Sequence, residues 1–499
     1  MNLVPRSDTL SINRFGDEVA RHVADGARLA GLFACVASPD TRLIALLSQS
    51  GSLNIRETVV PASVNSFPTL SNQVPAAAWY EREIHDLFGL IPRGLTRLDP
   101  LVFPFSATAL RPRLGSGTVV PEGQLEPSPL PAHLGGEGVF TISYGPVRSG
   151  VFESIEYLVE TPGEDIPHLR TRVFYKHRGV ETRFESLDVE DGVLLAERCE
   201  GVASVAHAIA YCSAIEDIAG VEVSFQAGLV RVLHAELERI ANHLDSIVRH
   251  CEASGQAVAF ARFTLHKERV QRLRAQLCGN RFGRGVVVPG GVSGGLGLGA
   301  VETLAAIDFL EQSIDVDTRL LMSTPSFLDR LRGTGVLTTD LARRFGALGP
   351  VARGSGLMED TRFDRTYGAY VHLGQQLLEI RPDGDALARQ RVRTQEITGS
   401  FSLLREVIEE LNTRADLSDH GWRRRVGTVS GRAVGWAEAP QGEVLYLIEV
   451  RDGQLVRVKP RSASFHNMAL FPIAFPKDIL TDFAFIEASF GLSIAGVSS

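Results

Sequence analysis

A proline- and glycine-rich segment at residues 104–137 divides the chain into two parts of different character. The segment reads PFSATALRPRLGSGTVVPEGQLEPSPLPAHLGGE and contains six prolines but no apolar periodicity. Proline lacks a backbone donor and restricts φ, so this composition disfavours both helices and central strands. We therefore predict a linker at 104–137 between a domain at 1–103 and a domain at 138–499.

The first part is typical of a small α/β unit. The segments RLIALLSQS (42–50) and SLNIRETVV (52–60) predict neighbouring strands joined by a turn at Gly51. The segment PAAAWYEREIHDLFG (75–89) predicts a helix, with proline in its first turn and glycine directly after its end. The charged residues of this helix are expected to form a solvated face: Glu81, Arg82, Glu83, His85 and Asp86.

The second part is mainly helical, with strands near its start and end. An apolar stripe with spacings of four and three residues predicts a helix at 229–251 that faces the core. The other predicted elements are a hairpin of strands at 139–146 and 152–164, helices at 300–321 and 385–412, and a second hairpin at 442–461 with an Asp452–Gly453 turn. The fold class that follows is α+β.

Composition excludes several classes of protein. The net charge of −8 and the absence of a basic cluster argue against a nucleic-acid partner. No apolar run reaches the roughly 20 residues of a membrane span, and the N-terminus lacks the apolar core of a signal peptide. The five scattered cysteines suit a reducing cytoplasm rather than a disulfide framework. We expect a cytoplasmic protein that can still sit on a membrane complex.

The segment ERCEGVASVAHAIAYC (197–212) places two cysteines, a histidine and a glutamate close together in sequence. If the segment is helical, Cys199 and Cys212 lie about 20 Å apart along the axis and cannot share a metal ion. Cys199 and His207 are then about two turns apart, also too far. The many small apolar residues favour a buried helix in which the cysteines act as small hydrophobes.

Several motifs resemble known oxidoreductase subunits. AWYEREIHDLFGLIPRGLTRLDPLV resembles the signature of the 30-kDa (C) subunit of respiratory complex I. Seven later segments resemble, in order, the 49-kDa (D) subunit: GPVRSGVFESIEYLVETPGE, YKHRGVET, ERCEGVASVAHAIAYCSAIE, RVLHAELERIANHL, PGGV, RGSGLMEDTR and EAPQGEVLYLI. The same segments resemble the large subunit of group 4 [NiFe] hydrogenases of the hydrogenase-4 and formate hydrogenlyase types, in which the two regions are often fused.

The resemblance implies a fold and a set of partners. The fold would be a small α/β domain like the 30-kDa subunit, followed by a mainly helical domain like the large subunit of [NiFe] hydrogenases, with small β-sheets. The chain would sit peripherally on the cytoplasmic side of a membrane. Its partners would be an iron–sulfur small subunit, like the one in complex I, and antiporter-like membrane subunits, with no nucleic acid.

The hydrogenase metal ligands have no counterpart at the matching positions. The hydrogenase pattern aligns through Arg198 and His207, which puts Glu200 and Ala203 where two ligand cysteines belong. Cys199 is one residue out of frame and is expected to face elsewhere. Thiolate sulfur is the ligand that a nickel–iron centre needs. The sequence therefore predicts no metal at this site.

Two further positions agree with this interpretation. The second ligand pair belongs near the C-terminus, but no cysteine follows Cys278. The arginine of the hydrogenase APRG motif is replaced by Gln441.

The 49-kDa subunit of complex I has also lost the metal and helps to form a quinone pocket, so the resemblance points to quinone chemistry. Its usual hydrogen-bond donors are histidines in the loop after GP and a tyrosine on a long helix. In this chain Arg148 and Phe152 stand at the histidine positions, and Gly201 aligns with the tyrosine. Both family donors are absent.

Four residues are the candidates for a site in the old metal cavity: Arg148, Glu200, His207 and Glu487. Arg148 could supply a fixed positive charge and donors, or it could form a surface salt bridge. Glu200, as a partly desolvated carboxyl, could relay protons, or it could be paired with an arginine. His207 could relay protons or be a core histidine with satisfied hydrogen bonds. Glu487 is placed there only by alignment of the tail.

Two other groups are interpreted as structural. His177, Arg178 and Glu181 of the HRGVE motif are expected to form a network beside the partner subunit. His234 and Glu238, four residues apart, are expected to be helix surface charges, because no third ligand is evident.

The predicted function is that of a subunit in a complex I-like or hydrogenase-4-like oxidoreductase. Electrons would pass from an iron–sulfur partner to a quinone-like acceptor, or redox chemistry would be coupled to proton translocation. A non-catalytic scaffold and a [NiFe] hydrogenase with atypical ligands are the alternatives. No glycine-rich dinucleotide loop follows a strand, so any NAD(H) chemistry belongs to another subunit.

Overall fold

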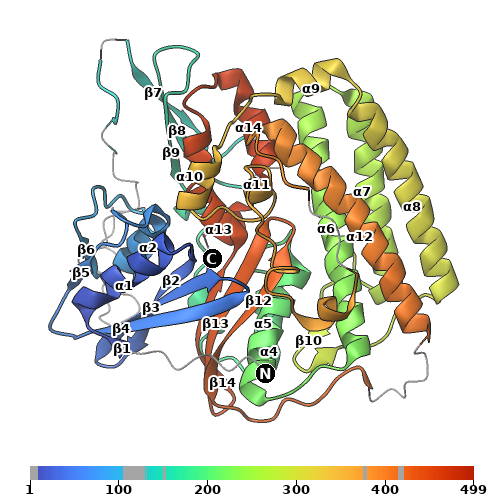
Figure 1. Ribbon diagram of the computed structural model, residues 1–499, viewed down its shortest axis with the longest axis horizontal. Helices are drawn as coiled ribbons and strands as arrows, with labels where there is room; N and C mark the ends of the chain where they lie inside the picture. The colour runs from blue at the N-terminus through green and yellow to red at the C-terminus, as the bar shows by residue number, and fades with distance from the viewer. Residues whose placement is uncertain are drawn as a thin grey trace.

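The structure is a computed structural model of the 499-residue chain, and it describes residues 9–104, 130, 132–136, 138–149, 153–374, 379–413 and 421–498. Most of the predicted linker lies outside the described residues, so the boundary at 104–137 stays a prediction. The N-terminal domain and the helical domain lie side by side (Figure 1). The mixture of a strand-rich N-terminal part and a mainly helical remainder confirms the α+β fold class.

The N-terminal domain is built on a sheet with the strand order β1-β4-β3-β2. Its strands are β1 (Thr9–Leu10), β2 (Arg28–Ala37), β3 (Asp40–Gln49) and β4 (Ser52–Val60), with helix α1 (Ile12–Ala24) packed against them. Strands β3 and β4 pair antiparallel as predicted, from Thr41–Val60 to Gln49–Ser52. Gly51 in their turn has a φ of 75°, a left-handed conformation that glycine adopts without strain.

The predicted helix at 75–89 is confirmed, but the expectation of a solvated charged face was wrong. A 3-10 turn (Pro75–Ala77) leads into helix α2 (Ala78–Phe88), which ends at Gly89 in the left-handed conformation. Glu81, Glu83, His85 and Asp86 are all buried. Composition could not reveal this burial, because the donors that satisfy these carboxylates come from loops that fold back over the helix and, for Glu83, from the second domain.

Two of these loops contact α2 directly. The Glu81 carboxylate accepts hydrogen bonds from the hydroxyls of Thr69 and Ser71 and from the backbone N–H of Leu70. Asp86 Oδ2 accepts the backbone N–H groups of Leu101 and Val102, each at 2.8 Å. Buried carboxylates that accept several hydrogen bonds of this kind tolerate the loss of water.

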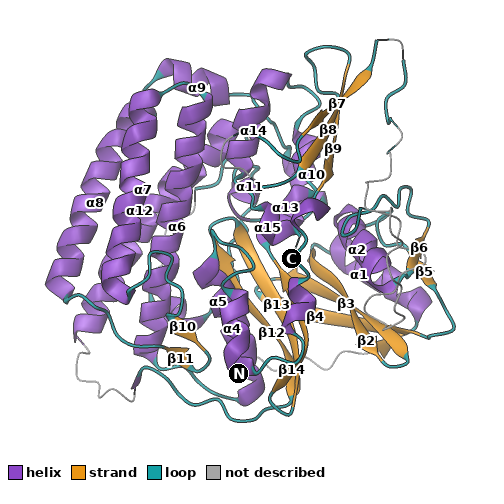
Figure 2. Ribbon diagram, turned by 180° about the vertical axis from the view of Figure 1, so that it is seen from behind, coloured by secondary structure: helices purple, strands orange, loops and turns teal. Residues whose placement is uncertain are grey.

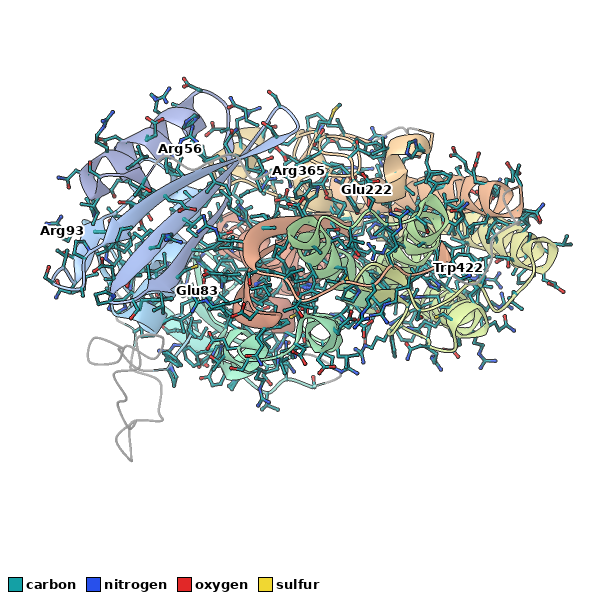
Figure 3. All side chains as sticks on the ribbon, turned by 90° about the horizontal axis from the view of Figure 1, so that it is seen from below. Arg56, Glu83, Arg93, Glu222, Arg365 and Trp422 are labelled. Carbon is teal, nitrogen blue, oxygen red and sulfur yellow. The ribbon has the colours of Figure 1, made fainter. Side chains whose placement is uncertain are left out.

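The charged face of α2 is also part of the interface with the second domain. Lys459 Nζ donates to Glu83 Oε1 at 2.6 Å and to Glu181 Oε1 at 2.5 Å. Tyr80 Oη lies 3.0 Å from His466 Nδ1. Figure 3 labels Glu83 on the side of the N-terminal domain toward the second domain, whereas Arg93 lies at the outer edge. Glu181 therefore belongs to a structural network, and this network joins the two domains.

Four long helices form the core of the second domain. They are α6 (Phe225–Ala253), α7 (Ala257–Cys278), α8 (Ala300–Leu321) and α12 (Ala386–Thr413), which run side by side in both views (Figures 1 and 2). The predicted stripe on α6 is buried throughout: Leu229, Leu233, Leu237, Ile240, Leu244 and Ile247. The helices predicted at 300–321 and 385–412 are likewise confirmed. Among the described residues no helix is both long and apolar enough to cross a bilayer.

A C-terminal sheet packs beside these helices. It consists of β12 (Gly431–Ala439), β13 (Gly442–Arg451) and β14 (Gln454–Arg461), and the predicted Asp452–Gly453 turn joins the last two. Helix α5 (Ser204–Ala219) lies against β12 and β13. Gly435 permits this approach, since a Cβ there would lie 2.0 Å from Ala210 O of α5.

The remaining elements surround these layers. The predicted hairpin is confirmed as β7 (Phe140–Tyr144) and β8 (Glu156–Thr161), extended by β9 (His168–Arg172). The C-terminal helices α13 (Ala463–Met468), α14 (Phe483–Phe490) and α15 (Ile494–Val497) lie between this sheet and α6 (Figure 1). The other elements are β5 (Ser66–Pro68), β6 (Ile91–Arg93), α3 (Val180–Phe184), α4 (Val189–Ala196), β10 (Val287–Val288), β11 (Gly291–Val292), α9 (Pro325–Leu331), α10 (Thr339–Arg344) and α11 (Gly349–Arg353), with short 3-10 turns at Phe174–Lys176, Gly368–His372, Phe471–Ala474 and Leu480–Asp482.

The segment 197–212 is not one continuous helix. Helix α4 ends at Ala196 and α5 begins at Ser204, so residues 197–203 form a turn. The distances expected for an unbroken helix therefore do not apply to Cys199. The turn determines which side chains of this segment meet in the site.

Candidate functional site

A cavity of about 200 Å³ lies where α6, β8 and the C-terminal helices meet. Its polar lining includes Arg148, Tyr157 of β8, Asp245 and Ser246 of α6, and Glu487 of α14. Apolar side chains complete the wall: Val202, Met468, Phe471, Phe490, Leu492 and Ile494. Apolar and polar side chains from different elements therefore converge on this cavity, as they do in small-molecule sites.

Arg148 and Glu487 meet in this cavity, although 339 positions separate them in the sequence. Arg148 Nη1 donates to a Glu487 carboxylate oxygen at 2.9 Å, and the Arg148 side chain is only 2% exposed. Its guanidinium lies 5.2 Å from the centre of the Tyr157 ring, within cation–π distance. Arg148 is therefore a largely buried cation in the cavity wall, and the surface salt bridge that was its alternative is not found.

Glu200 and His207 lie behind this wall in a separate buried cluster, so the four candidates do not form one site. Glu200 Oε2 is 3.1 Å from His207 Nε2, and both side chains are 1% exposed. Glu200 Oε1 accepts the hydroxyl of Ser464 at 2.7 Å. His207 Nδ1 lies 2.8 Å from Tyr446 Oη. Ser464 accepts the backbone N–H of Ser493, a cavity residue, which connects the cluster to the cavity wall.

His207 carries the most informative pKa of this cluster. Burial lowers it, but hydrogen bonds to Cys199 and Glu200 outweigh burial and raise the pKa of His207 to about 9. The imidazole is therefore protonated at neutral pH and donates from both ring nitrogens. Glu200 is paired with a histidine, where the sequence had offered an arginine as the structural alternative.

Cys199 faces this cluster, and the expectation that it faces elsewhere was wrong. Tyr446 Oη donates to Cys199 Sγ at 3.3 Å. The turn at 197–203 directs the Cys199 thiol into the interior. Arg178 stabilises this turn by donating hydrogen bonds to the carbonyl oxygens of Arg198 and Cys199. Arg178 thus has a structural role, as predicted for its motif.

The expectation for His234 and Glu238 was also wrong, because both are buried in α6. Glu238 accepts the backbone N–H groups of Val205 and Ala206 at the start of α5. Burial, together with the charge of Arg274, lowers the pKa of His234 to about 3. The partial positive charge at the N-terminus of α5 explains why the Glu238 carboxylate is buried at this point.

Several residues of the cavity were not predicted from the sequence. Tyr157 stands in a β-strand at a position without a family donor. On α6, Asn242, Asp245, Ser246 and Arg249 follow the spacing i, i+3, i+4 and i+7 opposite the apolar stripe. A polar stripe on a core helix could have indicated a cavity. Phe152 lies outside the described residues, and Gly201 lines the cavity without a side-chain donor.

Two family models match the chain. The model described as "Respiratory-chain NADH dehydrogenase, 30 Kd subunit" matches residues 17–112, and the model for the 49 Kd subunit matches residues 254–428. Hydrogenase-4 component G of Escherichia coli is 28% identical, over 82% of this chain and 72% of that protein. Formate hydrogenlyase subunit 5 of the same organism gives the same figures, 28%, 82% and 72%. The D subunit of the NADH-quinone oxidoreductase of Deinococcus radiodurans is 28% identical, over 66% of this chain and 88% of that protein.

The fold and these matches define a class of protein, the subunits of complex I-like and hydrogenase oxidoreductase complexes. Within that class the chain is a fusion of the 30-kDa and 49-kDa domains of complex I in one polypeptide, homologous to the 49-kDa (D) subunit of complex I and to the large subunits of group 4 hydrogenases.

The residues that the sequence resemblance predicts at the hydrogenase ligand positions do not fit a nickel–iron centre. Glu200 offers a carboxylate whose two oxygens are already hydrogen-bonded, and Ala203 offers no donor. Cys199 Sγ accepts a hydrogen bond from Tyr446, one residue out of frame. In the part of the chain that the structure describes, no group of three or more histidine, cysteine, aspartate or glutamate side chains is arranged to hold a metal ion.

Proposed function

We propose that this chain is a peripheral, cytoplasmic-side subunit of a membrane-associated oxidoreductase, and that its cavity binds a quinone-like acceptor. Electrons would reach the acceptor from an iron–sulfur cluster on a partner subunit. The observation that carries the proposal is the buried Arg148–Glu487 pair in the wall of a cavity that also presents apolar side chains from the C-terminal helices. The chain itself would hold no [NiFe] centre and no other resident cofactor.

The cavity supplies what quinone reduction requires. The reaction consumes two electrons and two protons, so the site needs an apolar slot for the ring and polar groups for the oxygens. Met468, Phe471 and Phe490 provide the apolar surface. Arg148 places a positive charge where negative charge develops on an acceptor oxygen. A volume of about 200 Å³ suits a single headgroup and is too small for a dinucleotide.

An exposed patch beside the cavity suits the iron–sulfur partner. Leu194, Val202 and Phe282 are 49%, 39% and 41% exposed, and Val202 also lines the cavity. Arg284 lies 5.5 Å from the centre of the Phe282 ring and donates to Ser204 at the start of α5. Exposed apolar side chains flanked by arginine are typical of protein interfaces. A partner seated here would close the cavity and bring its cluster close to the acceptor.

The test is turnover of the purified complex with decylubiquinone and reduced methyl viologen as electron donor. We expect quinone reduction by the native complex and a loss of about tenfold or more in kcat/KM for Arg148→Met, because the cation that stabilises the reduced oxygen is gone. Arg319→Met is the matched control, since Arg319 is 71% exposed on α8. Nickel analysis of the same sample should find far less than one atom per chain.

Three outcomes would contradict the proposal. Stoichiometric nickel together with hydrogen evolution would show a hydrogenase with atypical ligands. A native complex that assembles but neither binds nor reduces the quinone would show a scaffold that transmits conformational change to membrane subunits. Retained turnover in Arg148→Met would mean that the acceptor binds elsewhere.

A further inference from the structure

Tyr157 lines the cavity, and the packing of its ring does not explain why the residue carries a hydroxyl. Its ring lies among aromatic neighbours, 4.9 Å from the ring centre of Phe483 and 5.6 Å from that of Phe471. Phenylalanine would make the same ring contacts. The phenol, however, donates to Glu487 Oε1 at 2.8 Å. A buried hydroxyl therefore stands in the cavity wall, bonded to a carboxylate that the ring packing does not require.

The charged and titratable groups that face this phenol are Arg148, Glu487 and Tyr144. Burial, followed by the negative charge of Glu487, raises the pKa of Tyr157 well above its ordinary value, and Arg148 opposes this rise only in part. The phenol is therefore protonated at neutral pH. It is a donor that gives up its proton only to an oxygen that becomes strongly basic.

Glu487 connects the phenol with solvent. The Tyr157 residue is 1% exposed, whereas the Glu487 side chain is 19% exposed. One carboxylate oxygen accepts the phenol and the carboxylate also accepts Arg148, so its position is held from two sides. A proton from solvent that binds to Glu487 can pass to Tyr157 once the phenol has given up its own proton, because the two oxygens lie 2.8 Å apart.

We propose that Tyr157 is the proton donor to the bound quinone-like acceptor and that Glu487 reprotonates it; this inference rests on the function proposed above. As the acceptor takes up electrons from the partner's cluster, the Tyr157 O–H bond breaks and a new O–H bond forms on an acceptor oxygen. A proton held by Glu487 then moves to the phenolate oxygen, and Glu487 takes another proton from solvent. The donor thus lies on β8, at a different sequence position from the family's histidines and tyrosine, which align with Arg148, Phe152 and Gly201.

The test compares Tyr157→Phe with Tyr144→Phe in the intact complex. Tyr144 is 43% exposed and stacks on Tyr157 with ring centres 6.3 Å apart, so it is a neighbouring tyrosine with the same loss of one hydroxyl. With decylubiquinone we expect Tyr157→Phe to lower kcat about a hundredfold with little change in KM, because a general acid contributes about that factor. Tyr144→Phe removes a hydroxyl that hydrogen-bonds Arg148 but no proposed proton donor, so its kcat should fall far less than that of Tyr157→Phe.

A second variant tests the role of Glu487 as a positioning and relay residue. In Glu487→Gln the phenol keeps a hydrogen-bond acceptor but loses its source of protons. We expect a rapid first turnover followed by slow steady-state turnover, and a larger solvent deuterium effect on kcat than in the native complex. A merely structural role would slow both phases equally.

The outcomes separate this inference from the function on which it rests. If the native complex reduces decylubiquinone and Tyr157→Phe does so equally fast, the donor is another group and only this inference fails. If the native complex neither binds nor reduces the quinone, both fail. Equal thermal midpoints for the two tyrosine variants would show that the folds are intact.

Discussion

Glu200 Oε2 lies 3.1 Å from His207 Nε2, and both side chains are only 1% exposed. The pair is linked on one side to Ser464 of α13 and on the other to Tyr446 of β13. It therefore ties the turn at 197–203 to the C-terminal part of the chain. A charged pair with satisfied hydrogen bonds can hold these segments together without a metal.

This pair should make the stability of the chain depend on pH. The pKa of His207 is raised to about 9 from the ordinary value near 6.5, so its stabilisation is complete below pH about 6.5 and is lost as the pH rises through about 9. The loss should amount to about 3 kcal/mol. Urea unfolding midpoints at the two ends of this range should differ less in Glu200→Gln than in the native chain, whereas the surface variant Asp315→Asn should behave like the native chain. An equal decline in Glu200→Gln would contradict the ion pair.

Gly496→Ala should disturb the same cluster from the other side. A Cβ at Gly496 would lie 2.8 Å from Glu200 Cδ and 2.9 Å from Ser462 Oγ, so these buried groups must shift. We expect a loss of about 1 to 3 kcal/mol, measured by chemical unfolding. Gly163→Ala is the control, because a Cβ there meets no atom within 4 Å. Equal stability of the two variants would mean that the C-terminal segment does not pack on Glu200.

Lys459→Met should weaken the joint between the two domains. The lysine bridges Glu83 and Glu181, so its removal leaves the buried Glu83 carboxylate without the lysine cation, whereas Glu181 keeps its ion pair with Arg457. We expect a loss of about 3 to 5 kcal/mol, seen as a lower thermal midpoint. Adding Glu83→Gln should recover part of the loss, and the exposed Lys477→Met should have no effect. A single variant as stable as the native chain would show that the bridge is not formed in solution.

His234→Leu should stabilise the protein. The ring is 1% exposed, and within the described residues neither ring nitrogen has a hydrogen-bond partner. A buried polar group without a partner costs free energy, so a leucine of similar volume should raise stability by about 1 kcal/mol. His234→Gln keeps polar atoms in the same place and should bring no gain. Destabilisation by the leucine would indicate a buried water or another partner on the ring.

The sequence was a good guide to local structure. The helix predicted at 300–321 has those bounds in α8, and the strands around Gly51 and Asp452–Gly453 pair as predicted. These elements follow from apolar periodicity and turn chemistry, which depend on near neighbours. Arg148 and Glu487 were placed in one cavity by the family resemblance, but their direct pairing was not predicted.

The candidate site was harder to predict from sequence. Glu83, Glu238 and Cys199 were all misplaced, because each was judged by its own helix or its own few neighbours. Their surroundings come from Lys459, from the start of α5 and from Tyr446, which lie 33 to 376 positions away. Tyr157 was not recognised for the same reason, since its partner Glu487 is 330 positions away.

The amino-acid sequence by itself determined the elements and their order, since these depend on local periodicity and on residue identity. Only the tertiary structure decided which charged groups are buried and which of them share a cavity. The physical reason is that a buried charge is tolerated only where distant segments bring it a partner, and that meeting is a property of the packed chain.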